Sequence, residues 1–284
     1  MTTPSPERKP FIVAAAQLCS TNDVTANLAV CRKLAADAAE RGAEMFALPE
    51  CFAFIGRTLG DRLPVAERLD RPGPIVEEVR DMARKHRMWV VAGGMPEVSG
   101  VPQKTYNTCL VVDPDGETRA VYRKIHMFDV KIPGRAELCE SSSTAAGDDV
   151  VVAQTPFARL GLSICYDVRF PELYRVLAVE RGAEVLMVPA AFTAHTGAAH
   201  WHTLLRARAI ENQCFVVAAA QHGKHGPVRE SYGHTLIIDP WGEVMAEVQE
   251  GDGLAVAEID PAVLTRVREQ MPCHSHRVLG ARPE

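Results

Sequence analysis

The sequence lacks the features that would indicate a membrane, secreted or nucleic-acid-binding protein. None of its apolar runs approaches the ~20 residues that a bilayer-spanning helix needs. Residues 2–10 are polar and proline-rich, without the apolar centre of a secretion signal. Basic residues gather only in short groups such as Arg123-Lys124, and the formal net charge is −5. We therefore expect neither a membrane nor nucleic acid as a partner.

The eight cysteines also lack any paired spacing. Without a C-x-x-C pair, the sequence indicates neither a zinc ribbon nor a disulfide framework. Cys19, Cys109 and Cys214 lie in apolar runs, which is typical of reduced thiols in the core of a cytoplasmic protein. His200 and His202 would face different ways on a helix, so they make a poor metal-binding pair. Residues 273–276, Cys-His-Ser-His, have no partner cluster, and no metal or organic cofactor is expected.

A segment rich in glycine, serine or charge that could link two domains is also missing. The chain has 284 residues, of which 47% are hydrophobic and 24% charged, enough for a sizeable core. We predict a single domain over residues 10–270, followed by a tail over residues 271–284 that shows no periodicity. Residues 138–154 are predicted to form a polar connecting loop.

The chain instead contains an internal duplication. Arg-Gly-Ala-Glu, four apolar residues and proline occur at residues 41–49 and return at residues 181–189. Each copy predicts the end of a helix at glycine, a buried strand, and a proline that closes the strand. Asp-Pro-x-Gly-Glu likewise occurs at residues 113–117 and 239–243, where it predicts a turn between two strands.

Each half of the sequence therefore predicts the order strand, helix, strand, helix, strand, hairpin. Each half can form one mixed sheet with its helices on one face, and the other face must then be buried. Packing the two halves together buries both faces. The predicted fold is an α/β protein, a four-layer α-β-β-α sandwich with internal pseudo-two-fold duplication.

Cys165 lies where a predicted strand turns into a helix. Residues 160–164 are apolar and of strand length, and Pro171 suits the first turn of a helix. Open α/β sheets bind ligands at the carboxyl ends of their strands, and a thiol near a helix N-terminus has a lowered pKa. The alternative interpretation is one more buried, inert cysteine.

Glu50 and Lys124 also follow predicted strands, so they can meet Cys165 at one rim. Taken singly, Glu50 is better interpreted as a surface carboxylate and Lys124 as part of a solvated basic face, since about a quarter of any globular chain is charged. Taken with Cys165, they supply what a thiol needs to attack an amide. Glu50 provides a base and an acid if burial raises its pKa, and the Lys124 ammonium stabilises the oxyanion.

These residues lie in three segments that resemble the signature motifs of the nitrilase superfamily, the carbon–nitrogen hydrolases. The resemblance covers the chain from about residue 11 to the tail, and it implies an α-β-β-α sandwich, a homodimer or higher homo-oligomer, and catalysis by Glu50, Lys124 and Cys165. It also implies a supporting role for Glu140. The symmetric dimer would pack near residues 165–169. The motifs are Pro-Glu at 49–50, Tyr-Arg-Lys-Ile-His-Met-Phe-Asp at 122–129 and Gly-Leu-Ser-Ile-Cys-Tyr-Asp-Val-Arg-Phe-Pro-Glu at 161–172.

Finer features resemble the deaminated glutathione amidase branch and the related omega-amidases. They are Cys-Glu-Ser-Ser-Ser-Thr at 139–144, Gly-Ala-Ala-His-Trp at 197–201 and Ser-Tyr-Gly-His at 231–234. The implied activity is hydrolysis of the side-chain amide of a small carboxylate-bearing substrate, deaminated glutathione first. The alternatives are an omega-amidase acting on 2-oxoglutaramate and an N-carbamoyl amine amidohydrolase. Lys131 is a departure, because relatives more often carry an acid there.

The predicted reaction proceeds through a thioester on Cys165, with the Tyr166 backbone N–H as a further oxyanion donor. Arg169 is the candidate for binding a substrate carboxylate, and an ion pair with a neighbouring acid is its alternative role. Phe192 and Thr193 follow the second repeated proline and are candidates for lining the pocket, with core packing as the alternative for Phe192.

Two other classes of protein remain open from the sequence. A Cys-His hydrolase would use one of the ten histidines as its base, so that a histidine substitution, not one at Glu50, would abolish turnover. A non-catalytic scaffold on the same fold would form no acyl adduct. The presence of Glu50, Lys124 and Cys165 together favours the amidase.

Overall fold

The computed structural model describes residues 9–131, 138–226 and 229–280. Residues 1–8 and 281–284, which belong to the predicted polar start and the predicted tail, lie outside the described residues. Among the residues described, no helix combines the length and the apolar character that crossing a bilayer requires.

The strands form two large sheets. The first sheet has the order β13-β12-β1-β2-β3-β4-β5, with β16 also paired to β1. The second sheet has the order β15-β14-β11-β10-β9-β8, and β6 pairs with β7 separately. The first sheet consists of β1 (Phe11–Leu18), β2 (Met45–Leu48), β3 (Trp89–Val98), β4 (Thr105–Val112), β5 (Thr118–Arg123), β12 (Ala220–Lys224), β13 (Glu230–Tyr232) and β16 (Gly253–Ile259). The others are β6 (Asp129–Val130), β7 (Leu138–Cys139), β8 (Val152–Gln154), β9 (Arg159–Leu162), β10 (Val185–Met187), β11 (Phe215–Ala218), β14 (Thr235–Ile238) and β15 (Val244–Val248).

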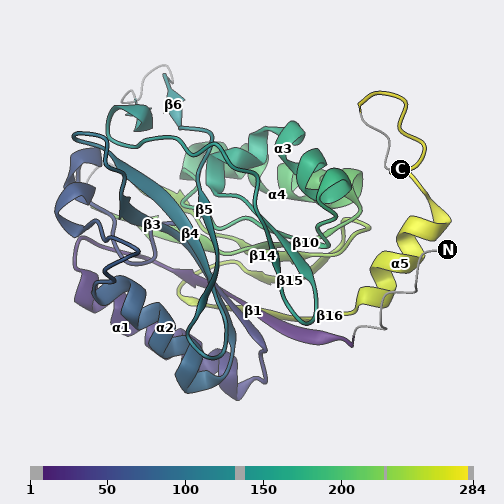
Figure 1. Ribbon diagram of the computed structural model, residues 1–284, viewed down its shortest axis with the longest axis horizontal. Coiled ribbons are helices and arrows are strands. Elements are labelled where there is room, and N and C mark those ends of the chain that lie inside the picture. The colour runs from purple at the N-terminus through teal and green to yellow at the C-terminus, as the bar shows by residue number, and fades with distance from the viewer. Residues whose placement is uncertain (1–8, 132–137, 227–228, 281–284) are drawn as a thin grey trace.

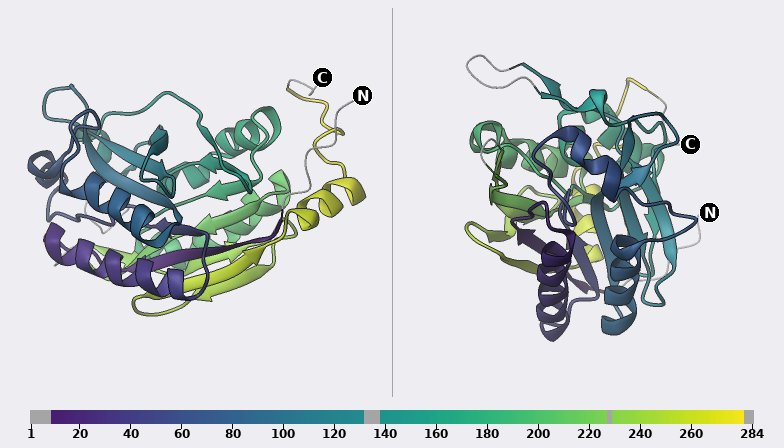
Figure 2. Two further views of the ribbon diagram at one scale, coloured as in Figure 1. Left: turned by 60° about the horizontal axis from the view of Figure 1, so that its bottom comes forward. Right: turned by 90° about the vertical axis from the view of Figure 1, so that its left-hand side faces the viewer.

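Helices cover the outer face of each sheet. Helices α1 and α2 lie on the first sheet, and α3 and α4 lie on the second, at the opposite side of the molecule (Figures 1 and 2). The α-helices are α1 (Val24–Glu40), α2 (Pro74–His86), α3 (Pro171–Arg175), α4 (Ala194–Asn212) and α5 (Pro261–Gln270). Short 3-10 helices are η1 (Leu59–Val65), η2 (Glu140–Ser142) and η3 (Cys165–Arg169), and η4 (Val176–Glu180) is a π-helix.

The buried side chains form three clusters, because alternate residues along each strand point to opposite faces of its sheet. In β2, Met45 and Ala47 pack between the two sheets, and Phe46 and Leu48 pack beneath α1 and α2. This is the period of two that a strand buried on both faces must have. A third cluster, which includes Trp201, fills the space between the second sheet and its helices. The predicted four-layer α-β-β-α sandwich is therefore confirmed.

The repeated Arg-Gly-Ala-Glu phrase has the same backbone role in both halves. Gly42 and Gly182 adopt positive φ angles of 76° and 69° after their helices. The following glutamates then use their backbones in the same way, because Glu44 N donates to Ile12 O and Glu184 N donates to the carbonyl of residue 159, each at 2.9 Å. The two Asp-Pro-x-Gly turns also match, since both aspartates accept backbone N–H groups from within their own turns.

Two details of the predicted topology were wrong. The halves do not keep to separate sheets, because β12, β13 and β16 from the second half join the first sheet. Strands β12 and β16 pair with the side of β1 that the first half leaves unpaired, and β13 pairs with β12. An unpaired strand edge is a site of aggregation. Residues 138–154 are not only a loop either. They contain β7, η2 and the short edge strand β8, whose few residues give no clear period.

Candidate active site

Glu50 follows the end of β2, directly after Pro49, and is only 3% exposed to solvent. Its Oε1 accepts hydrogen bonds from Asn107 Nδ2 at 2.8 Å and from the Lys124 ammonium at 3.3 Å. Its Oε2 accepts a hydrogen bond from Ala191 N at 2.8 Å. Because Ala191 comes from the second half of the chain and the other two donors from the first, the carboxylate bridges the two halves.

A glycine in β3 makes room for this carboxylate. Gly94 has a φ of +64°, and a Cβ added to it would lie 2.6 Å from Glu50 Cγ. Any other residue would be strained in its backbone and would displace the glutamate. The register of β3 with β4 also shifts here, between Ala92 and Met95.

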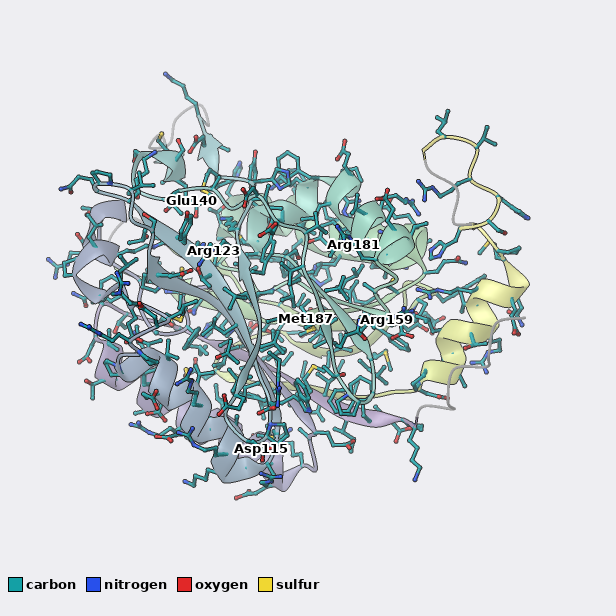
Figure 3. All side chains as sticks on the ribbon, in the orientation of Figure 1. Asp115, Arg123, Glu140, Arg159, Arg181 and Met187 are labelled. Carbon is teal, nitrogen blue, oxygen red and sulfur yellow. The ribbon has the colours of Figure 1, made fainter. Side chains whose placement is uncertain are left out.

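Lys124 lies between two carboxylates. It follows β5 and is 2% exposed, and its ammonium donates to Glu140 Oε2 at 2.7 Å as well as to Glu50. Glu140, on η2, also accepts a hydrogen bond from Phe128 N at 2.8 Å, and its Oε1 lies 3.8 Å from Arg62 Nη1. Figure 3 shows Glu140 at the same end of the molecule as Arg123, opposite Asp115. The cations thus compensate carboxylates that would otherwise be costly to bury.

Cys165 begins η3 at the carboxyl end of β9. Its φ is +49°, an uncommon angle for a residue other than glycine, and its N–H donates to Pro189 O at 2.9 Å. The half-buried thiol lies within hydrogen-bonding range of the Glu50 carboxylate. The predicted turn from strand to helix is present, and α3 begins at Pro171 as predicted. Strained backbone of this kind persists where the surrounding structure holds it in place.

The fully buried Asp167 holds the turn that presents the thiol. Its Oδ2 accepts hydrogen bonds from Ile164 N at 2.8 Å and from the Tyr122 hydroxyl at 2.6 Å. Its Oδ1 accepts one from His126 N at 3.1 Å and lies 2.7 Å from His126 Nδ1. Burial and the Asp167 charge raise the pKa of Tyr122 well above its usual value, so the hydroxyl remains a donor. The carboxylate therefore ties the Cys165 turn to β5.

We expect Asp167→Asn to lower both the free energy of unfolding and kcat. An amide cannot accept all of these hydrogen bonds, and each buried donor left without a partner costs about 1–3 kcal/mol. Urea denaturation and steady-state ammonia release measure the two effects. Tyr122→Phe is the matched control, because it removes one donor and keeps the contact to Ile164, so kcat should fall less. An equal loss of kcat in both variants would contradict this role for Asp167.

The pKa of Glu50 is lowered, so the condition considered from the sequence, that burial raises it, is not met. Burial does raise the pKa of this carboxyl, but the positive charges of Lys124, Arg62 and Arg229 outweigh it and hold the pKa at about 2. For Lys124, burial lowers the pKa, but Glu140 and Glu50 outweigh it and raise the pKa above its usual value. Glu50 in the free protein is therefore a carboxylate beside an ammonium.

The pKa of Cys165 is raised, which also corrects the prediction from its place near a helix N-terminus. Burial of the thiol and the neighbouring Glu50 charge raise the pKa well above its usual 9.0, although Lys124 opposes them. The turn that follows is a single short 3-10 helix, whose dipole is weak compared with these charges. The resting pair is thus a thiol and a carboxylate, an acid next to its base.

These pKa directions predict a level pH profile. We expect kcat/KM to stay constant between about pH 5 and pH 9, because Glu50 titrates below this range and Cys165 above it. The lowered pKa also means that the stability contributed by ionised Glu50 is complete above its usual 4.5 and is lost as the pH falls through about 2. Initial rates across this range, with circular dichroism at each pH, make the measurement. An acid limb near pH 4.5 in a folded protein would contradict the assignment.

The remaining predicted site residues lie around this centre. The Tyr166 ring packs edge-on against Phe128 and Phe170, with centroids 5.0 and 5.3 Å away. The half-buried Arg169 guanidinium lies 4.9 Å from the centre of the Phe192 ring.

Phe192, Arg169 and Thr193, the outer residues of the predicted site, each make contacts that bear on their roles. Phe192 is 4% exposed and packs in the core beneath α4, as its alternative role predicts. Arg169 Nη1 lies 3.2 Å from His200 Nδ1, a contact with an imidazole in place of the acid considered from the sequence. Thr193 precedes α4, and its hydroxyl lies 2.7 Å from the Thr196 hydroxyl.

Sequence reasoning missed several residues of the site. Asn107 reaches both Glu50 and Glu140, and its place in β4, between Tyr106 and Thr108, gives no sign of this. Arg62 lies in η1, in a stretch without periodicity, and its Nη2 donates to Cys51 Sγ at 3.2 Å. The Ala191 N–H is a backbone group, which no side-chain pattern can indicate.

The sequence is similar to proteins of a known family. Residues 12–269 match the family described as carbon-nitrogen hydrolase. A Synechocystis protein named deaminated glutathione amidase is 46% identical over 277 residues, covering 95% of this chain and 99% of the relative. The Caenorhabditis elegans nitrilase and fragile histidine triad fusion protein NitFhit is 47% identical over 270 residues, and the match covers 93% of this chain and 60% of that longer protein.

Solved structures agree with the observed layers. The crystal structure of C. elegans NitFhit has a TM-score of 0.88 at 45% identity, covering 96% of this chain and 66% of that one. The structure of Saccharomyces cerevisiae Nit3, a member of branch 10 of the nitrilase superfamily, has a TM-score of 0.87 at 29% identity, covering 98% and 100%. The fold of the whole described chain is therefore shared with these proteins.

Proposed function

Because the chain belongs to the carbon–nitrogen hydrolase family, we propose that it is a thiol amidase that releases ammonia from the side-chain amide of a small carboxylate-bearing substrate. That it hydrolyses carbon–nitrogen amide bonds follows from the family and from relatives named as amidases. The proposal adds the nucleophile, the intermediate and the substrate. The observation that carries it is the Cys165 thiol beside the Glu50 carboxylate, which in turn contacts the Lys124 ammonium.

In the first step, the sulfur of Cys165 attacks the amide carbonyl carbon while its proton passes to Glu50. The lowered pKa of Glu50 keeps it ionised and ready to accept this proton. Negative charge develops on the carbonyl oxygen, where the Lys124 ammonium and the Tyr166 backbone N–H stabilise it. A donor of this kind contributes roughly 3–4 kcal/mol to the transition state.

In the second step, the protonated Glu50 gives its proton to the departing nitrogen. The carbon–nitrogen bond breaks, ammonia leaves, and the acyl group remains on sulfur as a thioester. Water then attacks the thioester carbon as Glu50 takes one of its protons. The carbon–sulfur bond breaks, the proton returns to Cys165, and the carboxylic acid is released. Glu140 keeps the Lys124 ammonium in place throughout, through its 2.7 Å hydrogen bond.

We propose deaminated glutathione as the substrate, in line with the names of several relatives. A substrate with carboxylates needs a cation near the thiol, and Arg169, four residues after Cys165, is the candidate. Its guanidinium lies over Phe192 and beside His200, which together fix its orientation. Thr193 and Tyr166 complete the proposed pocket.

A panel of amides tests the substrate directly. We expect the highest kcat/KM for ammonia release with deaminated glutathione, and lower values with 2-oxoglutaramate, N-carbamoyl amines, nitriles and glutamine. A coupled assay for ammonia makes the measurement, with each substrate incubated without enzyme as the control. Preference for 2-oxoglutaramate would move the assignment to omega-amidase and would refute the proposed substrate.

We also propose a cytoplasmic homodimer that packs near residues 165–169. The sequence motifs imply the dimer, and reduced cysteines in the core fit a cytoplasmic location; all eight cysteines are free thiols in the structure. Size-exclusion chromatography with light scattering measures the assembly. A monomer at micromolar concentration would refute the dimer.

A further inference from the structure

Three side chains from distant parts of the chain meet outside the Cys165 site. His202 comes from α4, His234 lies between β13 and β14, and Glu247 belongs to β15. His202 Nε2 lies 3.1 Å from Glu247 Oε1, and His234 Nδ1 lies 2.6 Å from the same oxygen. All three potential ligand atoms lie within 4.8 Å of one another. Their spacing in sequence gives no sign of this arrangement.

The backbone and its neighbours orient the His234 side chain toward His202 and Glu247. Its φ is +57°, in the left-handed region that residues other than glycine rarely adopt. Its carbonyl accepts a hydrogen bond from Trp201 Nε1 at 2.8 Å, and the buried Trp201 anchors α4 in the core. The Tyr232 ring stacks on the imidazole, with centroids 4.3 Å apart. The ring is therefore confined on one side by Tyr232 and is directed at Glu247.

We propose that His202, His234 and Glu247 form a binding site for a zinc ion. Two imidazole nitrogens and one carboxylate oxygen are ligands that zinc accepts, at about 2.0–2.2 Å, and a site with three protein ligands leaves a fourth position for water. The side chains are 36%, 25% and 21% exposed, so an ion and a water molecule can reach them from solvent.

The distances from the two histidine nitrogens to Glu247 are close to those that a bound ion requires. Two atoms on one tetrahedral zinc lie about 3.3 Å apart. The separation of His202 and Glu247, 3.1 Å, already fits, and His234 would withdraw slightly from its 2.6 Å hydrogen bond. Binding needs no net loss of protons from neutral histidines, because each N–H moves to the other ring nitrogen. The metal then replaces two hydrogen bonds with three coordinate bonds.

Cobalt binding to the full-length Cys165→Ala protein tests the site, because Cys165 and its carboxylates are themselves potential ligands. We expect one Co²⁺ per chain, with visible absorption typical of nitrogen and oxygen ligands and no sulfur-to-metal charge-transfer band. Added Zn²⁺ should displace the cobalt. This readout needs no turnover, so it is independent of the proposed amidase function.

Variants identify the ligands. Glu247→Gln and His202→Gln should each weaken cobalt binding by more than the roughly 10–100-fold that loss of an outer partner costs. His202 is the safer of the two for folding, because its side chain lies at the surface of α4. His222→Gln is the matched control, since His222 Nε2 also lies 2.8 Å from a carboxylate, that of Asp252, but without a second histidine.

The proposal is overturned by any of three results. The first is no cobalt or zinc binding to the folded protein at millimolar metal, which would make the cluster a hydrogen-bonded one only. The second is unchanged binding in both ligand variants with circular dichroism intact. The third is a sulfur-to-metal band, which would place the ion on a cysteine such as the exposed Cys139 or Cys273.

Discussion

Replacing Cys165 with alanine should remove ammonia release from any amide and leave the protein folded. Cys165 is the only side chain that acts as a nucleophile in the proposed reaction, and loss of the nucleophile from a covalent hydrolase costs on the order of 10⁶ in kcat. Alanine adopts the φ of +49° no less readily than cysteine, so the turn should keep its shape. Ammonia release and thermal unfolding measure the two outcomes.

Cys109→Ala is the matched control for this variant. Cys109 is a fully buried thiol whose pKa is likewise raised by burial, to about 12, but it packs between the two sheets. We expect it to lose some stability through the small cavity and to keep its kcat. Undiminished turnover in Cys165→Ala would refute the thiol mechanism.

Replacing Lys124 with methionine should damage both stability and catalysis. Methionine fills similar space, but it leaves the Glu50 and Glu140 carboxylates facing each other without the cation between them. Removing one partner from a buried ion pair costs about 3–5 kcal/mol of folding free energy. Loss of an oxyanion donor adds about a 10²–10³-fold decrease in kcat. Urea denaturation and steady-state kinetics separate the two effects.

Arg123→Met controls for the loss of stability alone. Arg123 is the preceding residue, and its guanidinium pairs at 2.6 Å with Glu97, whose side chain is only 6% exposed. This variant also leaves a buried carboxylate without a cation, but away from Cys165. We expect it to be destabilised with kcat nearly unchanged. A similar kcat in the two variants would show that Lys124 has only a structural role.

The repeated phrases explain why the layers were predictable. The glycines at residues 42 and 182 end helices with positive φ, and the glutamates that follow use their backbones alike. Such local signals fix where each strand begins and which face it buries. The pairing of β16 with β1 joins residues more than two hundred positions apart, and nothing local specifies it. That is why the halves were wrongly assigned to separate sheets.

The sequence allowed the residues of the site to be predicted, but not the direction in which their pKa values are shifted. Strand ends indicated Glu50, Lys124 and Cys165, and the structure brings them together with Glu140. The pKa of Glu50 depends on Lys124, Arg62 and Arg229, which approach it only in the folded chain, and the pKa of Cys165 depends on its burial beside Glu50. From the sequence, Glu50 could supply an acid only if burial raised its pKa, and the Cys165 pKa was expected to be lowered; in the structure the Glu50 pKa is lowered and the Cys165 pKa is raised.

The lowered pKa of Glu50 and the raised pKa of Cys165 define the order of proton transfers in the proposed reaction. A thiol that stays protonated beside an ionised Glu50 is protected from ionising at neutral pH. It loses its proton only as it attacks a carbonyl, when the negative charge moves to an oxygen near Lys124. The cations thus keep Glu50 deprotonated before the attack, and the proton that it captures makes it the acid of the next step.

The most direct test of this account is the mass of Cys165 during a single turnover. Enzyme in excess over deaminated glutathione is quenched in acid at successive times, digested and analysed by mass spectrometry. We predict that the peptide containing Cys165 transiently gains the mass of the substrate less ammonia, and that Cys165→Ala shows no adduct. Full release of ammonia with no acyl group on Cys165 at any time, or with the group on another residue, would contradict the account.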